Sequence, residues 1–237
     1  MLLMRGLLLK TPLLQESEAG FDKLGRMTAS IAQALDTVHR RMRLACEAAG
    51  RDPAQVRLLA VSKTFPSEAV REAHAAGQVA FGENYIQEGV DKCRTLADLS
   101  LEWHCIGPIQ SNKTRLVAEH FDWVHSIDRL RTAERLAAQR PGHRPPLQVL
   151  LQVNIDGGPT KSGVAPAEAL DLALAVAAVP GLCLRGLMTI PDPQPDVAAQ
   201  LAVHRKAHAL WLQLQARLGP RFDTLSMGMT DDLEAAI

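Results

Sequence analysis

A regular alternation of short apolar runs with amphipathic segments is the feature that most restricts the fold of this chain. Continuous apolar runs begin near residues 56, 79, 102, 123, 147, 184 and 223. Runs of this kind are typical of strands buried on both faces of a parallel sheet. Segments with helical periodicity lie between several of them, at residues 67–76, 111–120, 128–139, 166–178 and 197–218. Alternating strands and helices indicate β-α-β units.

The spacing of these units predicts an α/β fold of the TIM (β/α)8-barrel type. The first five runs start 21–24 residues apart, and no linker rich in Pro, Gly or Ser divides the chain. Barrels of roughly 250 residues fold as single domains, and this chain has 237 residues. Only seven strands are found, however, whereas a closed barrel needs eight. We therefore expect either an open sheet of another topology or a barrel whose eighth strand is missing from this chain.

The amino-terminal segment, residues 1–26, is predicted to be a poorly ordered extension. Its apolar run Leu7–Leu9 is too short for the core of a signal peptide, and the acidic residues that follow argue against a transit peptide. A single domain is expected over residues 27–237. It begins with a helix over residues 31–49, where apolar side chains recur at helical spacing and either Thr28 or Ser30 can serve as the cap.

Composition excludes several classes of partner. The 26 basic and 26 acidic residues cancel and form no basic block, which argues against nucleic acid and against anionic membranes. No stretch approaches the roughly 20 apolar residues that a membrane span requires. Four cysteines without a CxxC pair predict reduced thiols and a cytoplasmic protein. His204 and His208 lie four apart without a third ligand, so we expect a solvated helix face and no metal site.

Lys63, which follows the first apolar run, is the first candidate for chemistry. In a strand, Leu59, Val61 and Lys63 share one face, and both faces are apolar up to this point. Active sites of barrels lie at the carboxyl ends of the strands. A desolvated lysine there has a lowered pKa and can attack an aldehyde to form a Schiff base. The alternative is a lysine that extends to the surface at a strand end.

Other strand ends carry polar or small residues that suggest a composite site. Ser226 offers a hydroxyl, Gly228 permits close backbone approach, and Thr230 precedes a short helix, a combination suited to binding phosphate. Each of these residues also fits an ordinary loop, with Thr230 as a helix cap. Further strand-end residues are Asn84, His104, Asn154, Met188 and Thr189.

Six segments together resemble the YggS/PROSC family, the pyridoxal 5′-phosphate (PLP) homeostasis proteins. The resemblance extends over residues 27–237 and keeps the order and approximate spacing of the motifs. It implies the alanine racemase N-terminal-domain fold, known as fold type III. The segments are LLAVSKT, FGENYIQE, EWHCIGPIQSNK, KSG, GLMTIP and LSMGMTDDLEAAI.

The resemblance also implies residue roles. Lys63 would hold PLP as a Schiff base, and Asn84, His104 and Met188 would surround the cofactor. The phosphate would bind at the seventh-strand loop, through Ser226, Met227 and Gly228. No catalytic or metal-binding residue is implied.

At its end the sequence departs from the family. Members continue into an Arg-Ile-Gly-Thr segment that forms the eighth strand, contacts the pyridine nitrogen and clamps the phosphate, whereas this chain ends at Ile237. Each lost charge-assisted contact costs roughly 1.5–3 kcal/mol. We therefore expect a truncated product with unpaired barrel edges and weakened cofactor affinity, unless another segment substitutes.

The expected function is a non-catalytic carrier that supplies PLP to apoenzymes and maintains vitamin B6 homeostasis. It would act as a monomer, although an open barrel edge favours association. The first alternative is a fold type III enzyme such as an amino-acid racemase, and the second is a truncated barrel with impaired cofactor binding. Racemisation needs acid/base groups on both faces of the substrate, and the chain has one tyrosine, Tyr85.

Overall fold

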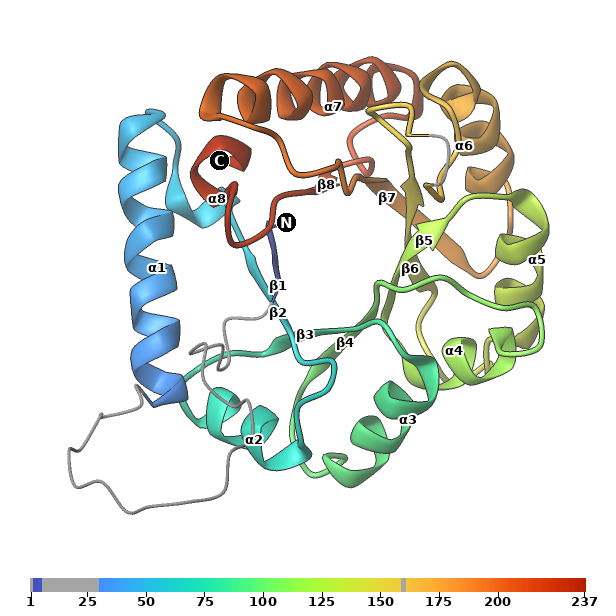
Figure 1. Ribbon diagram of the computed structural model, residues 1–237. Coiled ribbons are helices and arrows are strands. Elements are labelled where there is room, and N and C mark those ends of the chain that lie inside the picture. Colours follow the sequence, from blue (N-terminus) through green and yellow to red (C-terminus); the bar gives the residue numbers. More distant parts are fainter. Residues whose placement is uncertain (1, 6–29, 159–160) are drawn as a thin grey trace, which may run out of the picture.

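Eight parallel strands form one curled sheet in the computed structural model, which describes residues 2–5, 30–158 and 161–237 (Figure 1). Each strand pairs with the next in the chain, so the spatial order is β1 to β8 without a crossing. The strands are β1 Leu2–Arg5, β2 Leu58–Val61, β3 Ala80–Glu83, β4 Glu102–Cys105, β5 Trp123–Ile127, β6 Leu147–Gln152, β7 Leu182–Met188 and β8 Thr224–Ser226.

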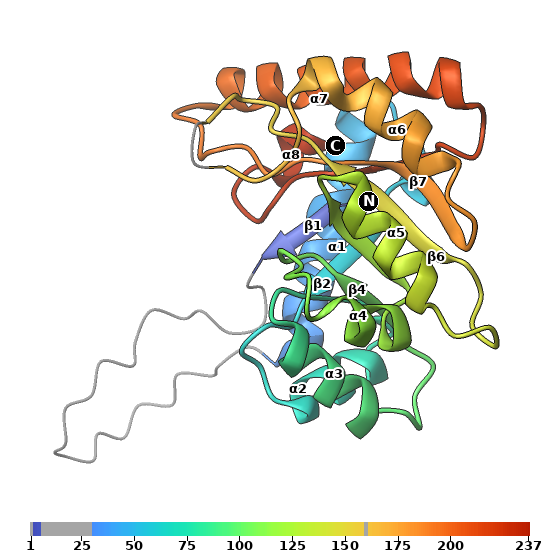
Figure 2. The same cartoon turned by 90° about the vertical axis from the view of Figure 1, so that its right-hand side faces the viewer.

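Helices surround the outer face of this sheet, as Figures 1 and 2 show from two directions. Each strand from β2 to β7 is followed by a helix that packs outside the sheet, which is the arrangement of a (β/α) barrel. The helices are α1 Ile31–Ala48, α2 Ser67–Ala75, α3 Ile86–Thr95, α4 Thr114–His120, α5 Leu130–Gln139, α6 Ala169–Ala177, α7 Val197–Leu218 and α8 Leu233–Ala236, with short 3-10 turns at Pro53–Gln55 and Pro166–Glu168.

Helix α1 illustrates how the sequence specifies these elements. The side chain of Ser30 accepts a hydrogen bond from the Gln33 N–H, and the Gln33 side chain accepts one from the Ser30 N–H. This reciprocal pair satisfies two N–H groups that would otherwise lack partners at the helix start. The apolar positions predicted from periodicity are buried, namely Ile31, Leu35, Val38, Met42 and Ala45.

The strands are buried on both faces, because helices cover the outside and side chains fill the inside. Leu58 and Ala60 of β2 belong to the large apolar cluster between sheet and helices. Leu59 and Val61 point the other way and pack in a separate inner cluster with Ile106. The alternation expected along this strand is therefore present.

The amino-terminal strand differs from the sequence prediction. Leu2–Arg5 pair in parallel with β2, in register from Leu2 opposite Leu58 to Arg5 opposite Val61. The predicted poorly ordered extension over residues 1–26 therefore does not hold for these four residues, and its remainder lies outside the described residues. The edge of β2 that we expected to be unpaired is covered, and no pairing joins β1 to β8 within the described part of the chain.

All seven predicted strands are present, in the predicted order, which confirms a TIM-like α/β fold. Their ends differ by a few residues, and α3 was not singled out, because Gly89 and several charged residues weaken its apolar stripe. In residues 30–158 and 161–237, no helix has the length and hydropathy required to cross a bilayer.

Replacing Phe121 tests the outer core. Its side chain is fully buried in the cluster between sheet and helices, so Phe121→Ala should lower the free energy of unfolding by about 3–5 kcal/mol. Urea denaturation followed by circular dichroism measures the change. Leu212, which is 47% exposed on α7, supplies the control: Leu212→Ala should leave the midpoint almost unchanged. Equal losses in both variants would contradict this assignment of the core.

Candidate functional site

The residues singled out in the sequence gather at or near the carboxyl ends of the strands. Lys63 lies in the turn after β2, half-buried, and Asn84 is the first residue after β3. Met188 and Ser226 end β7 and β8 and lie opposite each other in the sheet register. His104 lies within β4, deeper in the barrel. The rim therefore brings together groups from five of the strands.

The turn that carries Lys63 is fixed on both sides by the buried ammonium of Lys92 on α3. Lys92 Nζ donates to the carbonyl of Ser62 at 2.6 Å, and to carboxylate oxygens of Glu83 and Glu88, each at 2.7 Å. The Ser62 hydroxyl donates to Glu83 at 2.7 Å, and the Thr64 N–H donates to Glu88 at 2.6 Å. The backbone before and after Lys63 is thus bound to the same group of charges. We call Ser62, Glu83, Glu88 and Lys92 the lysine clamp.

The clamp lies in a low-dielectric environment and holds a strained residue. Burial raises the pKa of Glu83, although the hydrogen bonds from Lys92 and Ser62 oppose this rise. Thr64 has φ of 66°, in the left-handed region that β-branched residues rarely adopt. Strain of this kind persists only where surrounding contacts enforce it, and it is concentrated at functional sites. The Lys63 turn is therefore a candidate functional element.

A second buried network joins β4, β5 and β8 through the inside of the barrel. Glu102 Oε1 lies 2.6 Å from His104 Nε2, and His104 Nδ1 lies 2.9 Å from His125 Nε2. His125 Nδ1 lies 3.0 Å from Ser226 Oγ. His104, His125 and Ser226 are all fully buried. We call these four residues the histidine relay.

Burial keeps both imidazoles neutral near pH 7. Desolvation lowers the pKa of His104 despite its hydrogen bond to Glu102. Desolvation, with the neighbouring His104, lowers the pKa of His125 well below its ordinary value. Glu102 behaves in the opposite way: burial raises its pKa, but His104 and Arg57, 2.9 Å away, hold it below the ordinary value. The relay therefore ends in an ionised carboxylate.

The loop after β8 contains the residues predicted to bind phosphate, and its backbone is held by contacts within the protein. Gly228 has φ of 84°, a conformation that favours glycine. The carboxylate of Asp232 turns back to accept the Met229 N–H and lies 3.0 Å from His204 Nε2. This carboxylate is thus used within the loop and by α7. His204 is buried, so the expectation of a solvated helix face is wrong for this residue.

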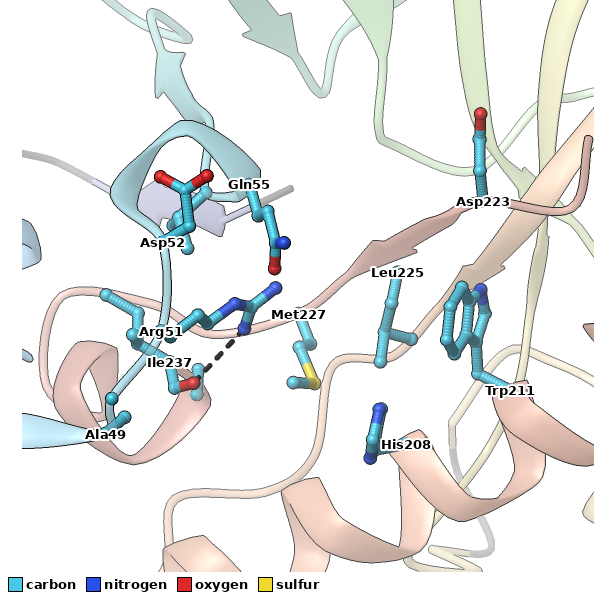
Figure 3. Close-up of a pocket in the computed structure, with 13 residues that line it drawn as sticks. Ala49, Arg51, Asp52, Gln55, His208, Trp211, Asp223, Leu225, Met227 and Ile237 are labelled. Atoms are coloured by element: carbon cyan, nitrogen blue, oxygen red, sulfur yellow. Dashed lines mark hydrogen bonds between the residues drawn. The ribbon is translucent and has the colours of Figure 1, made fainter. Parts of the chain in front are cut away.

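Met227 points away from Ser226, as alternation along a strand requires. Its side chain lines a cavity of about 740 Å³ on the outer face of β8, together with His208 and Trp211 of α7 (Figure 3). Figure 3 also shows the hydrogen bond from Arg51 to the Ile237 carbonyl, 3.1 Å, at the opposite side of this cavity. A role for Met227 toward a ligand at the rim would thus involve its backbone.

Buried polar atoms without protein partners remain at three strand ends. They are Asn84 Oδ1, Asn154 Oδ1 and Thr189 Oγ1, after β3, β6 and β7. A buried polar atom without a partner is costly unless a ligand or water satisfies it. The rim that carries Lys63 is therefore chemically suited to a polar ligand, and the Lys63 amine and Ser226 hydroxyl are the groups that would suit an aldehyde-bearing phosphate ester such as PLP.

Gly107 brings two of the rim loops into direct contact. A Cβ at this position would lie 2.1 Å from the carbonyl oxygen of Asn84, so only glycine fits. The Ser126 hydroxyl donates to the Gly107 carbonyl at 2.7 Å. The loops after β3 and β4 and the end of β5 are thereby held together.

No group of three or more His, Cys, Asp or Glu side chains suited to a metal occurs in the described residues. All four cysteines have free thiols, and Cys46 and Cys105 are buried.

A curled sheet of parallel strands with helices on its outer face, and a lysine in the turn after β2, place the chain in the (β/α)-barrel class of α/β proteins. Comparison identifies the family. Residues 34–236 match the family model described as alanine racemase, N-terminal domain, and the chain belongs to that family.

Curated relatives and solved structures agree with this assignment. The pyridoxal phosphate homeostasis protein of Pseudomonas aeruginosa is 59% identical, covering 88% of this chain and 89% of the relative. The protein of the same name from Escherichia coli K12 is 54% identical, covering 87% and 89%. The structure of PipY from Synechococcus elongatus with PLP bound has a TM-score of 0.70 and 36% identity, covering 82% of this chain and 92% of PipY. The resemblance inferred from the six sequence motifs is thus confirmed.

Patterns in the sequence do not predict several residues of the site. Lys92 and Glu88 lie on α3, a helix that the sequence patterns did not predict, and by residue type they resemble ordinary surface charges. His125 had a usable signal, because Trp123, His125 and Ile127 alternate on one face of a strand. Nothing in the sequence indicated that His104 and Ser226, 122 residues apart, would be linked through it.

The lysine clamp can be tested through stability. Lys92→Met leaves Glu83 buried without its cation, and breaking a buried ion pair in this way should cost about 3–5 kcal/mol of unfolding free energy. Arg71→Met, which removes an exposed pair with Asp98, should have little effect. Denaturant melts of the two variants and the parent give the comparison. A neutral Lys92→Met would show that the clamp does not hold the turn.

Proposed function

We propose that this protein binds PLP at the barrel rim, with the Lys63 amine as the covalent attachment point, and carries the cofactor without robust catalysis of its own. The observation that carries the proposal is that the backbone on both sides of Lys63 is held by hydrogen bonds. Its flanking residues are fixed by the lysine clamp at the carboxyl edge of the sheet, where barrel active sites lie. The names of the relatives and the PLP in the PipY structure support the same cofactor.

The protein's own residues would divide the work of binding. When bound, PLP supplies an aldehyde that condenses with an amine. Lys63 provides that amine, and the clamp holds its backbone in place. The loop after β8 offers the backbone around Gly228 and the Ser226 hydroxyl to the phosphate. Asn84, Met188 and His104 would surround the cofactor, with Met188 packed on Trp123.

Racemase activity is the second candidate, and the arrangement of acid/base groups disfavours it. Racemisation needs a proton donor and an acceptor on opposite faces of the substrate. The single tyrosine, Tyr85, precedes α3 with 58% of its surface exposed. Both rim histidines are neutral and occupied within the relay. A carrier needs neither group.

The proposal includes delivery of PLP to apoenzymes in the cytoplasm, by a monomer. Four free thiols fit a reducing compartment. Maintenance of the vitamin B6 pool would follow from reversible loading of the rim.

Attachment at Lys63 is tested by borohydride trapping. The purified protein incubated with PLP should develop a visible absorbance band, and reduction should fix the adduct to Lys63 in peptide mass mapping. Lys63→Arg should abolish both band and adduct, whereas Lys206→Arg, at an exposed lysine of α7, should retain them. An adduct that persists in folded Lys63→Arg would contradict the assignment.

The carrier and the enzyme are separated by a chiral assay. PLP-loaded protein incubated with L-amino acids should yield no D-enantiomer above the rate of free PLP. Turnover that depends on Lys63 would favour the racemase.

A further inference from the structure

The histidine relay has a direction, because one of its ends can only accept hydrogen bonds. Glu102 is ionised and paired with Arg57, so its oxygen accepts and His104 Nε2 must carry the proton. A neutral imidazole has one N–H, which leaves His104 Nδ1 as an acceptor. His125 Nε2 must then donate to it, across 2.9 Å.

The tautomer of His125 determines the orientation of the Ser226 hydroxyl. With its proton on Nε2, His125 Nδ1 can only accept, so Ser226 Oγ donates to it across 3.0 Å. A hydroxyl has one proton to donate. In the neutral relay, Ser226 therefore offers only lone pairs to the rim, which is unfavourable beside a phosphate dianion.

We propose that phosphate binding at Ser226 is coupled to uptake of one proton by the histidine relay, and that Glu102, at the far end, is the positioning residue that imposes this coupling. The inference rests on the proposed function, since it takes the PLP phosphate as the ligand. Glu102 is the first residue of β4, whereas Ser226 is the last residue of β8. Glu102 therefore influences Ser226 through the two histidines that lie between them.

Phosphate binding would shift three protons along the relay. The Ser226 proton passes to His125 Nδ1, the His125 Nε2 proton passes to His104 Nδ1, and one proton from solvent restores the Ser226 hydroxyl. His104 then becomes an imidazolium beside the Glu102 carboxylate, and His125 holds its single proton on Nδ1. Ser226 now accepts from His125 and donates to the phosphate. No bond other than those to hydrogen changes.

The charges around the relay are consistent with this assignment of the imidazolium. Glu102 lies against His104 and Asp122 contributes further negative charge, whereas Arg57 opposes protonation. Arg185 of β7 lies over the Trp123 ring, 5.1 Å from its centre, but its charge is paired with Asp223. His125 has no such carboxylate beside it among the described residues, and a positive charge on His104 lowers its pKa further. The carboxylate beside His104 makes it the favoured site for the added proton.

Replacing Glu102 with glutamine should remove the coupling while keeping the shape. A glutamine amide can donate to His104 Nε2 as well as accept from it. In Glu102→Gln all the hydrogen bonds of the neutral relay can therefore reverse their direction without uptake of a proton. This reversal frees the Ser226 hydroxyl to donate to phosphate. A purely structural role for Glu102 would predict weaker binding instead. Glu119→Gln, at a half-buried position on α4 away from the relay, is the matched control.

The first measurement needs no ligand. Nitrogen-15 NMR of the imidazole rings in the free protein should show His104 and His125 both protonated on Nε2, and Glu102→Gln should shift His125 toward the Nδ1 form. If His125 carries its proton on Nδ1 in the parent protein, the inferred direction of the relay is wrong.

The second measurement counts protons. Calorimetric titration with PLP at about pH 8, where a phosphate monoester is a dianion, is run in two buffers of different ionisation enthalpy. The parent and Glu119→Gln should take up about one more proton per PLP than Glu102→Gln. The ratio of their Kd to the Kd of Glu102→Gln should therefore rise about tenfold for each unit of pH increase. Pyridoxal, which lacks the phosphate, should show no such difference. Ser226→Ala should lose the extra proton even if Glu102→Gln proves unstable.

The outcomes separate this inference from the proposed function. PLP binding with equal proton uptake in the parent, Glu102→Gln and Ser226→Ala would overturn the coupling and leave the carrier function intact. Failure of the folded parent to bind PLP would overturn the carrier function and the coupling, while the NMR result would still decide the direction of the relay.

Discussion

Burial of the parallel strands on both faces is the constraint on which the rest of this structure depends. Helices cover the outer face and the inner face encloses Leu59, Val61 and Ile106, so polar groups placed there are shielded from solvent. A charge or imidazole placed there must find its partners within the protein. The lysine clamp and the histidine relay are both consequences of this requirement, and each joins residues distant in sequence at one site.

Much of the fold could be predicted because it depends on local patterns. Strand runs such as 58–61 and the stripe of α1 show their burial in the sequence itself. Helix α3 was harder, because Lys92 reads as a surface charge in sequence but is buried against Glu83. The strand Leu2–Arg5 could not be inferred, since pairing with β2 depends on an available sheet edge and not on any periodicity within four residues.

The site was predictable as a set of positions but not as networks. Lys63, Asn84 and Ser226 follow from their places at strand ends, combined with family resemblance. Glu102, His125 and Lys92 act through hydrogen bonds that depend on register between neighbouring strands and helices. Such register is a tertiary property, so residue type and spacing alone do not disclose it.

The lysine clamp also affects the entropy cost of binding a ligand at the Lys63 turn. Because three acceptors immobilise the Lys92 ammonium, the backbone on either side of Lys63 is ordered before any ligand arrives. The entropy of fixing that turn is therefore spent during folding and not at the moment of encounter. For the proposed carrier, a turn ordered in this way would release one ligand molecule and bind the next in the same conformation.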